Sequence, residues 1–153
     1  MKKCVLMIVS CLLLVGCTSL TVSPISSDSN LKHVVIVKNP KVKIKNFVSV
    51  LQEGFERHGI STKVYTGGKI PNQTGVVRYN AFRTWDLWPY MYDAEVTVVM
   101  QGSNQIGRGD YYLKGRGGLS LFKWRGTRYK IDPLMDELLQ NYQKPISAKP
   151  KKK

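Results

Sequence analysis

The feature that most constrains the fold is a strand–helix–strand pattern between residues 33 and 66. Residues 33–37 (HVVIV) contain a β-branched run that is typical of a buried strand. Residues 60–66 (ISTKVYT) alternate in a way that indicates a second strand, and apolar residues between the two recur at helical spacing. Because this order normally forms a parallel pair with a right-handed crossover, the sequence predicts a β-α-β unit.

The helix of this unit is predicted to begin at Asn39 and to end before Gly59. Asn is a preferred N-cap residue, and Pro40 suits the first turn, where its missing N–H group costs nothing. Glycine is favoured just after the last turn. The side expected to face the sheet carries Ile44, Phe47, Val48, Leu51 and Phe55.

Several later segments are predicted to be strands of an antiparallel meander. The links at 102–104 and 115–118 are short and contain glycine, which indicates hairpins. A backbone nest for an anion at 115–118, helped by Arg116, is the alternative, but a predicted strand rather than a helix follows it, which favours a plain turn. The predicted strands are 76–83, 93–101, 106–114 and 119–124.

A second helix is predicted from Asp132 and Pro133, which repeat the pairing of an N-cap residue with proline. Two amphipathic helices and one mixed sheet predict an α+β fold, a two-layer sandwich built from the β-α-β unit and the meander. The length of 153 residues suggests one domain. The apolar stripe of the second helix comprises Ile131, Leu134, Met135, Leu138, Leu139 and Tyr142.

The N-terminal segment has the organisation of a secretory leader. A basic start, Met1-Lys2-Lys3, precedes an uncharged stretch at residues 4–15. That stretch is too short to cross a bilayer as a helix, which needs about 20 residues. A buried N-terminal strand is the alternative, but it leaves the basic start and the abrupt polar turn after the apolar run unexplained.

Leu14-Val15-Gly16-Cys17 resembles the lipobox of bacterial lipoproteins. The resemblance implies cleavage after residue 16, an S-diacylglycerol group on the Cys17 thiol and an N-palmitoyl group on the new amino terminus. Residues 8–11 match more loosely, and cleavage there would leave too short an apolar run. Thr18, rather than Asp, follows the cysteine, and this implies the outer membrane with the domain on the periplasmic face.

Lipidation would also account for all three cysteines. Cys4 and Cys11 would leave with the leader, so the mature domain would hold no free thiol for a disulfide or a metal. Residues 17–32 are predicted to be a lipidated tether, because residues 18–29 are rich in Ser and Thr, and residues 33–143 the folded domain.

The charge of the chain is strongly positive and is concentrated at the C-terminus. The net charge is +14, and the basic tail at residues 144–153 holds five lysines and no acid. An excess of this kind favours anionic partners. For an exported chain these are envelope surfaces rather than nucleic acid; a solvated tail is the alternative. The tail residues proposed for such contacts are Lys149, Lys151, Lys152 and Lys153.

The most unusual segment is an aromatic cluster just before a predicted strand. Trp85, Asp86, Trp88 and Tyr90 lie within six residues. One interpretation is a platform for a glycan, with the aromatic rings stacking on sugars and the carboxylate accepting a hydroxyl hydrogen bond. The other is a packed corner with Trp85 and Tyr90 in the core, because large aromatic side chains are mostly buried.

The chain also resembles an uncharacterised family of small bacterial envelope lipoproteins. The motifs that carry the resemblance are W-D-L with Y-M at residues 85–91, G-G-L-S-L at 117–121 and K-I-D-P-L at 130–134. The resemblance covers most of residues 34–139. It implies a periplasmic α+β domain of the kind seen in accessory and assembly lipoproteins, and it implies no activity.

Residues for catalysis are few. Asp93 and Glu95 are predicted to share one face of a strand, about 7 Å apart, a separation that would suit an acid–base pair. Exposed acids on a half-solvated sheet are more common, and no nucleophile or metal-ligand motif is present. The sequence therefore predicts a non-enzymatic lipoprotein without cofactor or metal. We expect an accessory or assembly component acting through a protein partner, with glycan or lipopolysaccharide binding as the alternative.

Overall fold

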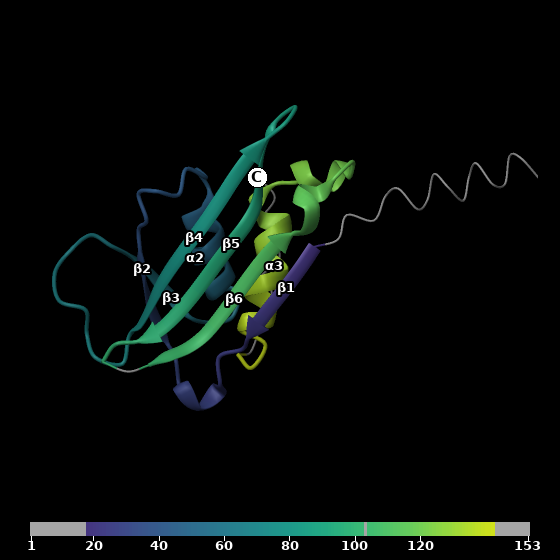
Figure 1. Cartoon of the computed structure of the whole chain (residues 1–153). Helices are drawn as coiled ribbons and strands as arrows, with labels where there is room; N and C mark the ends of the chain where they lie inside the picture. The colour runs from purple at the N-terminus through teal and green to yellow at the C-terminus, as the bar shows by residue number, and fades with distance from the viewer. Residues whose placement is uncertain (1–17, 103, 143–153) are drawn as a thin grey trace, which may run out of the picture.

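A mixed six-stranded sheet with two α-helices on one face forms the described part of the chain, residues 18–102 and 104–142, in the computed structural model (Figure 1). The predicted α+β class and the mixed sheet are confirmed. The order across the sheet is β1-β6-β5-β4-β2-β3. The leader, Cys17 and the basic tail lie outside the described residues. No helix of the described part is long and apolar enough to cross a membrane.

The β-α-β unit is present as predicted. Strands β2 (His33–Val37) and β3 (Ser61–Tyr65) pair in parallel, and α2 (Phe47–Glu56) connects them. The helix begins later than expected, with Asn46 at its N-cap position. Asn39 instead closes a turn, because its Oδ1 accepts a hydrogen bond from the backbone N–H of residue 41 at 3.0 Å while its Nδ2 donates to the carbonyl of residue 79 at 3.0 Å.

The antiparallel meander is also confirmed. Strands β4 (Gly75–Trp85), β5 (Pro89–Met100) and β6 (Gln105–Leu113) pair in sequence, and β4 pairs in parallel with β2 on its other side. The β4–β5 hairpin extends past the end of β6, since the last residue of β5 on that side to pair with β6 is Asp93.

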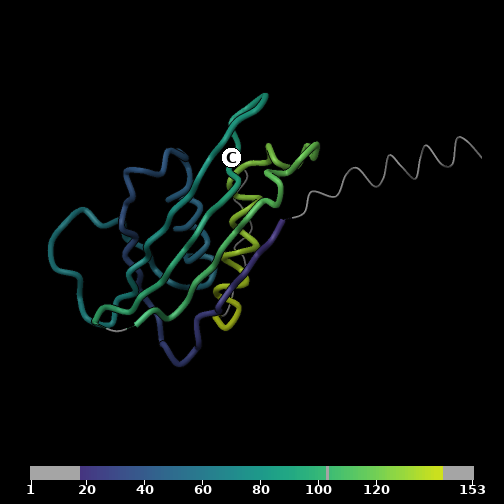
Figure 2. The backbone as a smooth tube through the Cα atoms, viewed as in Figure 1, coloured from purple at the N-terminus to yellow at the C-terminus, as the bar shows by residue number. Residues whose placement is uncertain are grey.

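The prediction of a tether is wrong for the residues directly after Cys17. Thr18–Ser23 form strand β1, which pairs antiparallel with the open edge of β6 (Figure 2). Behind it, Ile25 is fully buried and its backbone N–H donates to the carbonyl of residue 138 at 2.9 Å. The Ser/Thr-rich composition concealed alternating residues that suit an edge strand. The folded domain therefore begins at Thr18 rather than at residue 33.

The strand predicted at residues 119–124 is absent. A short 3-10 helix, η3 (Leu121–Trp124), takes its place, and another, η2 (Lys114–Gly117), lies at the link before it. The hydroxyl of Ser120 accepts a hydrogen bond from the N–H of Phe122 at 3.3 Å, which starts η3. Arg116 has a φ of 51°, and three glycines of this link also have positive φ. The link is therefore a compact left-handed loop and not a hairpin.

The last helix, α3 (Thr127–Leu138), begins five residues before the predicted start. Asp132 is not its N-cap; its carboxylate instead pairs at 3.0 Å with Arg57, the C-cap residue of α2. Pro133 sits inside the helix, where it removes one backbone hydrogen bond. The predicted apolar stripe from Ile131 to Leu139 is fully buried.

Glycines on β6 and α2 let the two helices pack closely. A Cβ atom at Gly109 would lie 2.7 Å from a methyl of Leu134, and one at Gly54 would lie 2.9 Å from Met135. α3 therefore packs directly on β6, and α2 packs on α3. This arrangement places the start of α3, the η2–η3 loop and the tip of the β4–β5 hairpin at one end of the sheet (Figure 1).

Candidate functional site

This end of the sheet, called here the aromatic end, comprises the hairpin tip at residues 85–89 and the loop at residues 114–126. Among the described residues, the five most exposed large apolar side chains all lie here. Contiguous exposed apolar residues mark interaction surfaces more often than isolated ones do. The exposed fractions are 72% for Trp85, 69% for Leu87, 64% for Trp88, 85% for Leu119 and 68% for Leu121.

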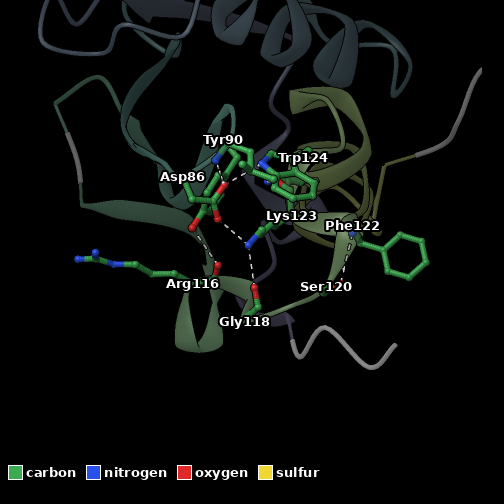
Figure 3. Close-up of polar contacts among 10 residues, drawn as sticks. Asp86, Tyr90, Arg116, Gly118, Ser120, Phe122, Lys123 and Trp124 are labelled. Carbon is green, nitrogen blue, oxygen red and sulfur yellow. Dashed lines mark hydrogen bonds and ion pairs between the residues drawn. The ribbon is translucent and has the colours of Figure 1, made fainter. Parts of the chain in front are cut away.

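Asp86 joins the two parts of the aromatic end (Figure 3). One carboxylate oxygen lies 2.6 Å from Nζ of Lys123, and the other accepts hydrogen bonds from Nε1 of Trp124 at 3.2 Å and from the N–H of Leu87 at 2.6 Å. The hydrogen bond from Lys123 is the main cause that lowers the pKa of Asp86. The carboxylate therefore fixes the hairpin tip to η3.

Trp88 takes part in the same junction. Its ring meets that of Trp124 edge to face, with centroids 5.8 Å apart and planes at 90°. This geometry is favourable for aromatic pairs, and it leaves most of Trp88 in solvent. Trp85 is also exposed, so the predicted burial of Trp85 in a packed corner is wrong.

Tyr90 differs from the two tryptophans. It is 7% exposed, and its hydroxyl donates a hydrogen bond to the carbonyl of Arg116 at 3.1 Å (Figure 3). Two lysine ammonium groups flank its ring, with Lys123 5.6 Å and Lys130 5.7 Å from the centroid. Tyr90 therefore packs in the core, as the packed-corner interpretation predicted for this residue.

Lys123 and Lys130 are buried cations that sequence reasoning missed. Nζ of Lys123 donates to the carbonyl of Gly118 at 2.7 Å, besides its ion pair. Nζ of Lys130 donates to the carbonyls of Met91 and Lys123, both at 2.6 Å. Burial lowers the pKa of Lys130 to about 8. A signal was available, since Lys130 falls in register with the apolar stripe of α3.

A basic groove of about 270 Å³ lies between the hairpin and the segment before α2. Its aromatic walls include Tyr90 and Trp124, and its lining residues include no acid. Such a groove is suited to anionic ligands. Its cationic lining residues are Lys43, Lys45, Arg83 and Arg125.

Of the two carboxylates considered for catalysis, Glu95 belongs to an ion-pair network on β5 and β6. Arg108 lies 3.3 Å from Glu95 and 2.9 Å from Asp110. Burial is the main cause that raises the pKa of Asp93, with neighbouring carboxylates adding to it. In the described residues, no three His, Cys, Asp or Glu side chains are placed to hold a metal ion.

Comparisons with known proteins assign no family to this chain. No family model matches, and no curated protein matches. Among solved structures, a PelC dodecamer from Paraburkholderia phytofirmans is similar over 78% of this chain and 98% of that chain, with 10% sequence identity and a TM-score of 0.49. A similarity of this size carries no argument about function.

Proposed function

We propose that this protein is an outer-membrane lipoprotein, anchored through Cys17 with its domain in the periplasm. It acts as an accessory or assembly component of the envelope, through contact with a partner protein rather than through catalysis. The observation that supports contact is the hairpin tip, where Trp85, Leu87 and Trp88 are exposed although the tip is held in place by Asp86.

A contiguous group of large apolar side chains in solvent marks an interaction surface more often than isolated ones do. Tryptophan is enriched among the residues that dominate binding energy at protein interfaces. A tip already fixed by an ion pair and an aromatic contact loses little conformational entropy on binding. These properties make the hairpin tip a preorganised contact surface.

The anchor is tested by mass spectrometry of the mature protein. We expect a new N-terminus at Cys17 that carries a diacylglycerol thioether and an amide-linked acyl chain. In a Cys17→Ser variant the protein should leave the membrane fraction. An intact Met1, or an unmodified Cys17 thiol, would overturn the proposed anchor.

The contact is tested by photo-crosslinking in intact cells from a reactive residue at position 88. A discrete protein adduct is expected from this position and should be absent from position 137, an exposed site near the far end of α3. Trp85→Ala should lower the adduct yield from position 88 without changing the unfolding transition. The same adduct from both positions would argue against a specific tip surface.

A second candidate function is binding of an envelope glycan or lipopolysaccharide. The basic groove favours it, because Arg83 and Arg125 lie beside the aromatic walls of Tyr90 and Trp124. In that case Tyr90 would form only a wall of the groove. Trp85 and Trp88 would form its exposed rim. Arg83→Gln should weaken retention on immobilised lipopolysaccharide severalfold, whereas Lys69→Gln, in an exposed loop elsewhere, should not. Equal retention would leave protein contact as the function.

A further inference from the structure

The strand directly after Cys17 brings one part of the aromatic end next to the proposed anchor. Thr18 is already hydrogen-bonded into the sheet, where it lies opposite Leu113, and Leu113 is followed at once by η2. Cys17 is bonded to Thr18, so the two Cα atoms are only about 3.8 Å apart. With no tether between them, acyl chains on Cys17 would hold this end of the domain at the bilayer surface.

The side chains beside Thr18 are apolar and exposed. Leu119, Leu121, Phe122 and Tyr129 have exposed fractions of 85%, 68%, 44% and 55%. Their position next to the start of β1 is shown by a cavity of about 480 Å³ whose lining includes Thr18, Phe122 and Tyr129. Phe122 and Tyr129 therefore lie beside the point from which the anchor would leave the domain, and Leu119 and Leu121 are near neighbours of Phe122 in the sequence.

The exposed charges of the segment that carries these side chains are basic, and Asp132, which also lines the cavity, is paired with Arg57 at 3.0 Å. Residues 111–131 contain six lysines and arginines and no acidic residue. Two of the lysines are buried and Arg128 pairs with Glu53, but Lys114, Arg116 and Arg125 are exposed. The guanidinium of Arg125 lies over the ring of Tyr129 at 4.1 Å and over that of Phe122 at 4.5 Å, so cation and apolar surface form one patch.

We propose that this patch is a membrane-docking surface, which lies flat against the anionic phospholipid headgroups of the leaflet that carries the anchor. The docking surface consists of the four exposed apolar residues named above with Lys114 and Arg125; Arg116 lies outside it, because its guanidinium is over the ring of Tyr92 at 5.5 Å. Apolar and aromatic side chains enter the headgroup boundary, and cations gain about 1 kcal/mol each near an anionic surface. The inference rests on the proposed anchor for its orientation, but the surface itself is separately testable.

A protein partner for this patch is less consistent with the geometry than lipid. Acyl chains on Cys17 would place the bilayer within one residue of Thr18, on the side where the patch lies. The hairpin tip is formed by another segment, residues 85–89, and is not part of the docking surface, so it stays available to a partner protein. The aromatic end therefore carries two separate surfaces, the docking surface for lipid and the hairpin tip for a protein partner.

The experiment uses the lipidated protein in vesicles of phosphatidylethanolamine and phosphatidylglycerol. Leu121→Cys introduces a single reactive thiol, to which an environment-sensitive fluorophore is attached; Glu137→Cys, near the far end of α3, is the matched control. Lipids brominated on their acyl chains should quench the fluorophore at position 121 at least severalfold more than at position 137. Equal quenching at the two positions would overturn the docking surface.

The charge dependence is tested in the same assay. Lys114→Gln and Arg125→Gln together should lower the equilibrium constant for docking about fivefold for each charge removed. Lys32→Gln with Lys69→Gln, two exposed lysines beside one cavity at the start of β2, are the matched control and should leave quenching unchanged. Quenching at position 121 that is indifferent to both pairs would overturn the role of the anionic headgroups.

Failure of the anchor and failure of the docking surface give different results. If mass spectrometry finds Cys17 acylated but position 121 is not quenched, the docking surface is wrong and the anchor stands. If Cys17 is unmodified, the labelled chain with Cys17→Ser is mixed with the same vesicles, and quenching at position 121 then supports the docking surface without the anchor. A protein adduct from position 121 in cells, with no quenching, would assign the patch to a protein partner instead.

Discussion

The β-α-β unit and the aromatic end place apolar and charged side chains in opposite ways. In the β-α-β unit, Phe47, Leu51 and Phe55 are fully buried, while the lysines before α2 are exposed. At the aromatic end Leu119 is 85% exposed, while Lys123 and Lys130 are 7% and 4% exposed. The β-α-β unit has the distribution that stabilises a fold, with apolar side chains inside and charged ones in solvent. The aromatic end carries a cost in stability that only binding would explain.

The largest difference between the two regions should appear in the free energy of unfolding. Phe55→Ala removes a fully buried ring and should cost about 3–5 kcal/mol. Trp88→Ala removes a ring of similar size that is 64% exposed, and should cost no more than about 1 kcal/mol, mainly the contact with Trp124. Urea denaturation of both variants measures these values. Equal losses would mean that the hairpin tip is part of the core.

The buried lysine of α3 should give a dependence of stability on alkaline pH. The native pKa of Lys130 is about 8, below its ordinary value of 10.5, so the unfolded chain binds more protons between these pH values. The wild-type protein should therefore gain stability as pH rises from 8 to 10.5, relative to Lys130→Met, by about 1–3 kcal/mol. The neutral amine still has two hydrogens for the carbonyls of Met91 and Lys123.

This prediction is measured by denaturation of both proteins at a series of pH values, because the other titrating groups are common to the two. A constant difference across the alkaline range would mean that Lys130 is solvated in the native state. A difference that shrinks as pH rises would mean that its pKa is raised rather than lowered.

Asp86→Asn should loosen the hairpin tip without unfolding the domain. The pKa of Asp86 is lowered, chiefly by the hydrogen bond from Lys123, so the carboxylate stabilises the fold above its unfolded pKa and this contribution is lost as pH falls through the lower folded pKa. Amide hydrogen exchange of residues 85–89 should become faster in the variant at neutral pH and similar to wild type in acid. Asp28→Asn, at an exposed carboxylate in the short 3-10 helix η1 (Ser27–Ser29), is the control and should change nothing at the tip.

Sequence patterns predicted the elements whose side chains obey the ordinary division between core and solvent. The β-branched run of β2 and the stripe of α2 were recognisable because burial set their periodicity. Leu119 and Leu121 alternate with Ser120, and this pattern predicts a strand. The structure shows both side chains in solvent, so the pattern reflects an exposed surface and not a sheet.

The sequence did not predict strand β1 or the role of Asp86, and the two omissions have separate causes. The strand at Thr18–Ser23 depends on pairing with β6, a partner about ninety residues away in the sequence, which local composition does not reveal. Within the candidate site, the unusual density of Trp85, Asp86 and Trp88 was visible in the sequence. The role of Asp86 as a link to Lys123 was not, because it depends on how the hairpin meets η3.

The smallest effect on stability is expected at Leu119, where it separates folding from binding most clearly. Leu119→Ser replaces a side chain that is already 85% exposed, so the free energy of unfolding should stay within about 0.5 kcal/mol of wild type. The same change at Leu31, which is 2% exposed, should cost several times more. Quenching of the label at position 121 by brominated lipids should nevertheless decrease in Leu119→Ser. If neither stability nor quenching changes, Leu119 serves neither folding nor docking, and the contrast between the two regions would rest on the hairpin tip alone.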